Sequence, residues 1–158
     1  FRQTPKLRLT NFPFMPYNNC IRNDFSHSKD ASMIHGTGVD LIEISRIKNS
    51  IQKYSGKFEE RVFTSKEIDY CRSKADPFKH FAARFAAKEA VLKSLGTGMA
   101  AGISWKDMEI LNQKSGRPVL SLSGKGRDIF DLLNLRDIHI SITHDKQYAV
   151  AQAIAEMN

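Results

Sequence analysis

An alanine-rich stretch from Pro77 to Leu95 constrains the fold of this chain more than any other feature. Proline suits the first turn of a helix and glycine commonly follows the last, so Pro77 and Gly96 predict its two ends. Apolar residues surround this predicted helix on most sides, which indicates that it is largely buried. The helix also contains charged residues, which need partners or a function there: Arg84, Lys88, Glu89 and Lys93.

Shorter patterns precede this helix. Residues 34–42 are typical of a buried strand and contain Gly36 and Gly38, and glycines inside a strand often mark the close approach of a ligand or another backbone. Ser45 is a candidate N-cap for a helix that carries apolar residues at helical spacing. Residues 64–67 form a capping-box sequence that predicts the start of another helix.

The second half of the chain predicts two strand pairs. Residues 105–111 and 118–122 flank a glycine-containing loop, and residues 138–143 and 148–154 flank a four-residue turn. Residues 123–133 have the pattern of a helix between these pairs. The order predicts an α+β fold in which an antiparallel sheet packs on one side of the long helix.

The length of 158 residues suits a single domain, which we expect over residues 33–158. Residues 1–32 lack periodicity and are interpreted as a disordered extension, either an expression remnant or a targeting segment. Their arginines and few acids fit a transit peptide weakly. We expect a cytoplasmic location, or a location in an organelle if residues 1–32 are a transit peptide.

Composition excludes several classes of protein. Cys20 and Cys71 lie far apart without a CxxC partner, which argues against a zinc site and a disulfide framework. No apolar run reaches the roughly 18 residues that a membrane span needs. Glycine-rich dinucleotide, P-loop and GxSxG motifs are absent from the sequence. The formal net charge of +7 favours an anionic partner but does not choose among nucleic acid, phosphorylated cofactors, acidic proteins and anionic lipid.

Two carboxylates are candidates for chemistry. Asp40 lies in an apolar stretch, where a carboxylate must bind a cation or accept hydrogen bonds. The ordinary alternatives are a helix cap or a salt bridge to Arg46. Glu89 lies between alanines that leave room for a ligand, and it shares a helix face with Lys93. Its ordinary alternative is a solvated Glu–Lys pair.

Two loop segments could bind phosphate. Gly96-Thr97-Gly98 follows the long helix and could expose backbone N–H groups to phosphate oxygens, although glycine at this position is also an ordinary helix cap. His144 lies in the last predicted turn, where it is either a surface residue or part of an anion-binding rim.

Taken together, three segments resemble the holo-[acyl-carrier-protein] synthases, the small homotrimeric type of 4'-phosphopantetheinyl transferase. The opening strand resembles the family's Gly-x-Gly-x-Asp motif, ending at Asp40. Residues 84–93 with the 96–98 loop resemble its signature helix, and segments within residues 140–152 resemble its closing hairpin. The resemblance covers residues 33 to about 156 and implies the 4'-phosphopantetheinyl transferase fold.

The resemblance implies an enzyme that transfers 4'-phosphopantetheine from coenzyme A to a serine of apo-acyl carrier protein and releases 3',5'-ADP. It assigns Asp40 and Glu89 to a Mg²⁺ ion, which suits an ion that prefers one or two carboxylates plus phosphate oxygens and water. Asp40, Glu89 and Lys93 are the implied catalytic residues, and Lys93 would contact the pyrophosphate.

The resemblance also implies the coenzyme A contacts. Arg84 and His144 would lie near the nucleotide end. The family often has basic residues just before its signature helix, where this chain has Ala75-Asp76-Pro77, and Lys74 or Lys79 could substitute. The full implied set is Arg84, Lys93, Gly96, Thr97, Gly98, Arg117, Pro118 and His144.

The implied partners are coenzyme A, an acidic acyl carrier protein bound at Arg46, Lys48 and Lys53, and two further copies in a homotrimer with active sites at subunit interfaces. No nucleic-acid or membrane partner is expected. The competing hypothesis is a basic module that binds RNA or another polyanion without catalysis. The aromatic residues argue against it, because most lie at helix-core spacing and not on an exposed strand face.

Overall fold

The computed structural model describes residues 33–54 and 56–158. By its contacts the chain divides into two units, Phe1–Asp30 and Ala31–Asn158, and everything below concerns the second. The expectation about residues 1–32 lies outside the described residues.

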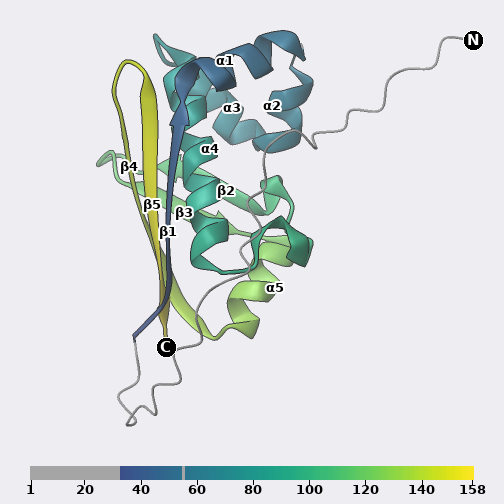
Figure 1. Cartoon of the computed structure of the whole chain (residues 1–158), viewed down its shortest axis with the longest axis vertical. Coiled ribbons are helices and arrows are strands. Elements are labelled where there is room, and N and C mark those ends of the chain that lie inside the picture. Colours follow the sequence, from purple (N-terminus) through teal and green to yellow (C-terminus); the bar gives the residue numbers. More distant parts are fainter. Residues whose placement is uncertain (1–32, 55) are drawn as a thin grey trace, which may run out of the picture. The chain divides into compact units, whose positions relative to one another are not determined.

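A long helix and a three-stranded sheet form the centre of this unit. Helix α4 (Pro77–Ser94) lies along one face of the sheet, whose strand order is β1 (Ile34–Glu43), β5 (Tyr148–Met157), β4 (Leu135–His144) (Figure 1). Both strand pairs are antiparallel. This arrangement confirms the predicted α+β fold with an antiparallel sheet packed on a long helix.

Small residues allow the sheet and the helix to lie close together. The alanines of β5 at positions 149, 151, 153 and 155 are buried, and their spacing of two residues puts them on one face of the strand. A side chain at Gly38 would place its Cβ 1.9 Å from the carbonyl oxygen of Ala90 in α4, and one at Gly36 would place it 2.4 Å from that of Ser94. The glycines of β1 therefore serve the close approach of a helix backbone.

The remaining elements surround α4. Three short helices, α1 (Ile44–Lys53), α2 (Lys57–Val62) and α3 (Ser65–Arg72), gather around one end of α4 (Figure 1). A separate hairpin of β2 (Met108–Asn112) and β3 (Pro118–Leu122) is followed by α5 (Gly124–Leu132). Two 3-10 turns, η1 (Gly98–Ala101) and η2 (Trp105–Asp107), connect α4 to this hairpin. No described helix is both long and apolar enough to cross a membrane.

Local patterns predicted most element ends, with three differences. The capping box at Thr64 is present, and α4 ends beside Gly96 as expected. The predicted cap at Ser45 is wrong, because Glu43 is the N-cap and the Ser45 hydroxyl donates to the Glu43 carboxylate. Residues 105–107 form a 3-10 turn and not the start of a strand, because Ser104 and Asp107 form their own capping box. Helix α2 was not predicted at all.

Candidate active site

Asp40 and Lys93 join β1 to α4 at the predicted catalytic position. The side-chain spacing of two residues puts Asp40 on the same face of β1 as the glycines that contact α4. Lys93 Nζ lies 2.8 Å from Asp40 Oδ1 and donates a second hydrogen bond of 2.8 Å to the Val39 carbonyl oxygen. The ion pair that Asp40 forms is therefore with Lys93 in the long helix.

Glu89 lies one turn before Lys93 on α4 and is half-buried. Burial raises the pKa of its carboxyl group above the ordinary value, the negative charge of Asp40 raises the pKa further, and Lys93 lowers it. The electrostatic influence of Asp40 on Glu89 indicates that the two carboxylates are neighbours. Two neighbouring carboxylates with a single lysine beside them attract a further cation.

This pair of carboxylates fits Mg²⁺ by the chemistry of its donors. Mg²⁺ commonly takes one or two protein carboxylates and completes its coordination with water and substrate phosphate. In the described ranges there is no group of three or more His, Cys, Asp or Glu residues that could hold a metal ion by themselves. A cation held by Asp40 and Glu89 would therefore need oxygen ligands from a substrate or from water.

The loop after α4 combines open backbone with an unpaired hydroxyl. Gly96 and Gly98 have φ angles of +69° and +55°, a conformation that favours glycine, and a Cβ at either position would meet nothing within 4 Å. Among the described residues, Thr97 Oγ1 is buried and has no hydrogen-bond partner. A buried hydroxyl of this kind is stabilised by a bound acceptor or donor, which suits the predicted phosphate contact.

Lys88 anchors the same helix on its other side. Its Nζ is fully buried and donates to Glu67 Oε2 at 2.7 Å, to the Val62 carbonyl at 2.8 Å and to the Trp105 carbonyl at 3.0 Å. Glu67 also accepts hydrogen bonds from the backbone N–H groups of Thr64 and Ile110. This buried ion pair ties α4 to α3, β2 and η2, and so fixes the helix that carries Glu89.

Arg84 is 2% exposed, and its guanidinium forms hydrogen bonds within the protein. One guanidinium nitrogen donates to Asn112 Oδ1 at 2.9 Å, and the other terminal nitrogen donates to the His80 carbonyl oxygen at 3.4 Å. Asn112 in turn donates to the Gly116 carbonyl oxygen at 2.7 Å. Arg84 is thus connected through Asn112 to the loop that carries Arg117 and Pro118.

His144 ends β4 and is exposed. Its ring meets the ring of His80 edge-on, with centroids 5.4 Å apart, and His80 meets Tyr70 in the same way at 5.9 Å. The structure therefore brings His144 to the first half of α4, whereas Glu89 and Lys93 lie in the second half, where Asp40 contacts Lys93 from β1.

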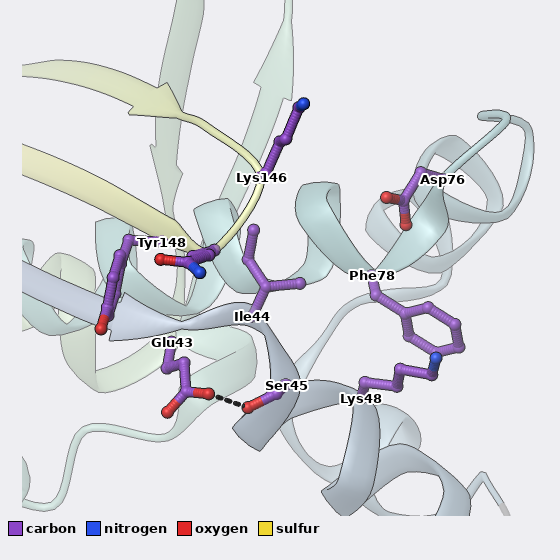
Figure 2. Close-up of a pocket in the computed structure, with 9 residues that line it drawn as sticks. Glu43, Ile44, Ser45, Lys48, Asp76, Phe78, Lys146 and Tyr148 are labelled. Carbon is purple, nitrogen blue, oxygen red and sulfur yellow. Dashed lines mark hydrogen bonds between the residues drawn. The ribbon is translucent and has the colours of Figure 1, made fainter.

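The three residues predicted to contact the carrier are exposed on α1. Lys48 lines a pocket of about 420 Å³ beside the β4–β5 turn, and in Figure 2 its side chain lies along the ring of Phe78, 5.5 Å from the ring centroid. Lys53 lies 5.5 Å from the Tyr54 ring, and Arg46 lies on the same helix. The pocket begins at Glu43, three residues beyond Asp40 on the same strand.

Several residues that hold the site residues in place were not predicted from the sequence. Lys88 and Glu67 were not recognised as partners, because they lie 21 positions apart and no local spacing joins them. Asn112, Tyr70 and His80 were missed for the same reason. One signal was present: Lys88 follows two buried alanines of a mostly apolar helix, where a lysine needs a buried partner.

Comparison with known proteins identifies the class. Residues 36–153 match the model of the 4'-phosphopantetheinyl transferase superfamily, and the chain belongs to this superfamily. Within it, the chain is similar to proteins named holo-[acyl-carrier-protein] synthase. The protein of that name from Koribacter versatilis is 47% identical over 78% of this chain and 99% of its own length, and that from Geotalea daltonii is 45% identical over the same shares.

Solved structures agree with this similarity. The Bacillus anthracis holo-(acyl-carrier-protein) synthase in complex with coenzyme A (3',5'-ADP) is 35% identical, with a TM-score of 0.67 over 80% of this chain and 100% of that one. The Helicobacter pylori enzyme in complex with coenzyme A is 30% identical, with a TM-score of 0.68 over 76% of this chain and 99% of that one. These findings confirm the family that the three sequence segments resemble.

Proposed function

We propose that this chain transfers 4'-phosphopantetheine from coenzyme A to a serine of apo-acyl carrier protein. The observation that carries the proposal is the ion pair beside Glu89, in which Lys93 Nζ lies 2.8 Å from Asp40 Oδ1. This ion pair lies in a chain that is 47% identical to a protein named holo-[acyl-carrier-protein] synthase. In this reaction the serine oxygen forms a bond to the phosphorus that carries pantetheine. The bond from that phosphorus to the bridging oxygen breaks, 3',5'-ADP leaves, and the serine proton is lost.

Asp40 and Glu89 would hold a Mg²⁺ ion, which when bound neutralises charge on the pyrophosphate. The raised pKa of Glu89 supports this assignment, because burial and the negative charge of Asp40 both disfavour its carboxylate, which a bound cation would stabilise. Lys93 would place its amino group at the pyrophosphate from the position fixed by Val39 and Asp40. These three residues would orient the reacting phosphate and stabilise its charge.

The coenzyme A contacts follow α4 from one end to the other. The 96–98 loop would bind phosphate through its amides and the Thr97 hydroxyl, which has no partner among the described residues. His144 and the Arg117–Pro118 segment would bind the nucleotide end. For Arg84 we propose an indirect part, because its guanidinium is buried and holds both His80 and, through Asn112, the 113–117 loop.

Arg46, Lys48 and Lys53 would bind the carrier protein. They are exposed on α1, which begins directly where β1 ends, three residues after Asp40. An acidic partner bound there would be attracted by the positive charge, and its serine would be brought toward the carboxylate pair. The pocket beside Lys48 adds an apolar ring, Phe78, to this surface (Figure 2).

The outer face of the sheet supports the homotrimer. Val39 and Leu41 are 55% and 60% exposed on the face of β1 opposite α4. They pair with Gln152 and Val150 of β5, and Tyr148, 41% exposed, continues the same face. An apolar sheet face of this kind is stabilised by association with another copy, which would bring each site near a subunit boundary.

Intact-protein mass spectrometry tests the function directly. The full chain is incubated with apo-carrier, coenzyme A and Mg²⁺, and the carrier is expected to gain the mass of one phosphopantetheine. EDTA is expected to stop the gain, and excess Mg²⁺ to restore it. A carrier that keeps its mass, together with RNA binding that weakens steeply with salt, would favour the polyanion-binding module. The cytoplasmic location stays a prediction.

A further inference from the structure

Glu89 has no hydrogen bond that fixes its carboxylate. In the described part of the chain no group donates to it, whereas Asp40 accepts a hydrogen bond of 2.8 Å from Lys93. The direction of Glu89 therefore depends on the helix that carries it. Its two neighbours in sequence are held on two sides of α4: Lys88 by its buried ion pair, and Ala90 by the close approach of β1.

The ammonium group of Lys88 uses all three of its donors. Its acceptors belong to three different elements, since Val62 ends α2, Glu67 lies in α3 and Trp105 begins η2. Glu67 is fully buried as well, and both of its carboxylate oxygens accept hydrogen bonds from backbone N–H groups. These fixed acceptors define where Nζ lies, and so they restrict rotation of α4 about its axis.

Stability alone does not explain a buried ion pair at this place. Taking two charges out of water costs free energy that their attraction often only just offsets, and apolar residues of similar volume can be equally stabilising. The pair differs from an apolar contact in its direction, because hydrogen bonds of 2.7–3.0 Å do not tolerate sliding or rotation. Consecutive helical residues point about 100° apart, so fixing Lys88 also fixes the direction in which Glu89 leaves the helix.

We infer that the buried Lys88–Glu67 pair is a positioning device for the cation site. It holds α4 in the rotation that turns Glu89 toward Asp40, and so it sets the affinity of the two carboxylates for a divalent cation. This inference rests on the proposed function and concerns two residues that supply no ligand to the cation. Groups that hold metal ligands in place commonly change metal affinity by about 10–100-fold when they are removed.

The test removes both charges together, so that neither is left buried without a partner. In Lys88→Met/Glu67→Gln the side chains keep their approximate size, and glutamine can keep the capping box at Thr64. The matched control is Arg72→Met/Glu59→Gln. This second ion pair joins α3 to α2 and, in the ranges described, forms no hydrogen bond with α4.

Cation affinity is measured with Mn²⁺, which like Mg²⁺ prefers oxygen ligands and is detected by electron paramagnetic resonance. The full chain is titrated with saturating coenzyme A, and a titration without protein corrects for cation bound by coenzyme A alone. The rate of carrier modification is then measured against Mg²⁺ concentration for the same proteins. Thermal melts show whether each protein is folded at the assay temperature.

Lys88→Met/Glu67→Gln is expected to bind Mn²⁺ about tenfold more weakly than the wild type. It should need about tenfold more Mg²⁺ for half of its maximal rate, and it should approach the wild-type rate at saturating Mg²⁺, because both carboxylates are still present. Arg72→Met/Glu59→Gln should keep the wild-type values. A pair with only a structural role would change the melting temperature and leave the Mn²⁺ affinity unchanged.

Wild-type Mn²⁺ affinity and Mg²⁺ requirement in folded Lys88→Met/Glu67→Gln would overturn the inference. Equal weakening in the two double variants would also overturn it, because the effect would then follow from loss of any buried pair. If Lys88→Met/Glu67→Gln does not fold, Glu67→Gln alone is measured, and its Mn²⁺ affinity should fall in the same direction by a smaller factor. Unchanged affinity in Glu67→Gln would then overturn the inference.

The proposed function fails by a different result. A wild type that binds no Mn²⁺ with coenzyme A, or that does not modify the carrier at any Mg²⁺ concentration, would contradict the transfer activity itself. A wild type that does both, with a cation affinity independent of the buried pair, would contradict only the positioning role of Lys88 and Glu67.

Discussion

Single residues of this chain acquire their roles from partners far away in the sequence. Asp40 lies 53 positions before Lys93, yet the two form a 2.8 Å ion pair. Asp40 alone could have been a cap or a partner of Arg46, and Glu89 alone could have been half of a surface pair. Their position on β1 and α4, where Asp40 influences the pKa of Glu89, supports the proposal that the two carboxylates hold one cation.

Removal of the buried charge at Lys88 should destabilise the fold strongly. In Lys88→Met, Glu67 would remain fully buried without its cation, so the free energy of unfolding should fall by about 3–5 kcal/mol. Lys66→Met is the matched control, because Lys66 pairs with Glu109 at the surface and exposed pairs contribute about 1 kcal/mol or less. Urea unfolding measures the free energy of unfolding of both variants. An equal loss of stability in the two variants would contradict the assigned role of the buried pair.

Cys71 should not react in the folded protein. Its thiol is buried, and burial raises its pKa to about 12, so the reactive thiolate is nearly absent at neutral pH. Peptide mapping after iodoacetamide treatment should find Cys71 unlabelled in the native chain and labelled in denaturant. Rapid labelling of the native chain would contradict this burial.

The sequence nominates the candidate site residues but not the residues that support them. Asp40, Glu89, Lys93 and the 96–98 loop could be named because they fall in short motifs with fixed spacing. The sequence did not identify the Lys88–Glu67 pair, Asn112 or His80. Each of them depends on contacts between elements that local spacing does not specify.

At the scale of elements, the contact of β1 with α4 determines the geometry of the site. Backbone groups meet where Gly38 faces Ala90, and Asp40 follows two residues later on the same face. The ends of α3 and α4 could be predicted because caps and prolines act locally. The three-residue turn at Trp105 could not be predicted, because capping at Ser104 decided a weak local preference. Helix α2 could not be predicted either, because its formation depends on the burial of Phe58 and Val62.

A methyl group at Gly38 should separate β1 from α4. The new Cβ would lie 1.9 Å from the Ala90 carbonyl oxygen, so Gly38→Ala should lose about 1–3 kcal/mol of stability or more and should lengthen the contact between Asp40 and Lys93. Thr37→Ala, an exposed change on the same strand, should have little effect. Thermal unfolding compares the two, and a Gly38→Ala chain as stable as Thr37→Ala would contradict the close packing.

At the scale of the whole molecule, the exposed apolar residues of the sheet predict self-association. The wild type should be a trimer, as proposed, and Leu41→Asp should be a monomer, because it puts a charge among the exposed apolar residues of the outer sheet face. Leu132→Asp is the matched control, since Leu132 is 83% exposed on α5, away from that face. Analytical ultracentrifugation gives the mass of each, and a monomeric wild type, or a trimeric Leu41→Asp, would contradict the proposed interface.

The central claim is that Asp40 and Glu89 are the carboxylates of a phosphopantetheine-transfer site. The most direct measurement is the rate at which apo-carrier gains phosphopantetheine from coenzyme A in the presence of Mg²⁺, for the wild type, Asp40→Asn and Glu89→Gln. We predict that the wild type modifies the carrier completely and releases 3',5'-ADP in equal amount. Each folded variant should be slower by at least about a hundredfold. Wild-type rates in either variant, or no transfer by the wild type, would contradict the account.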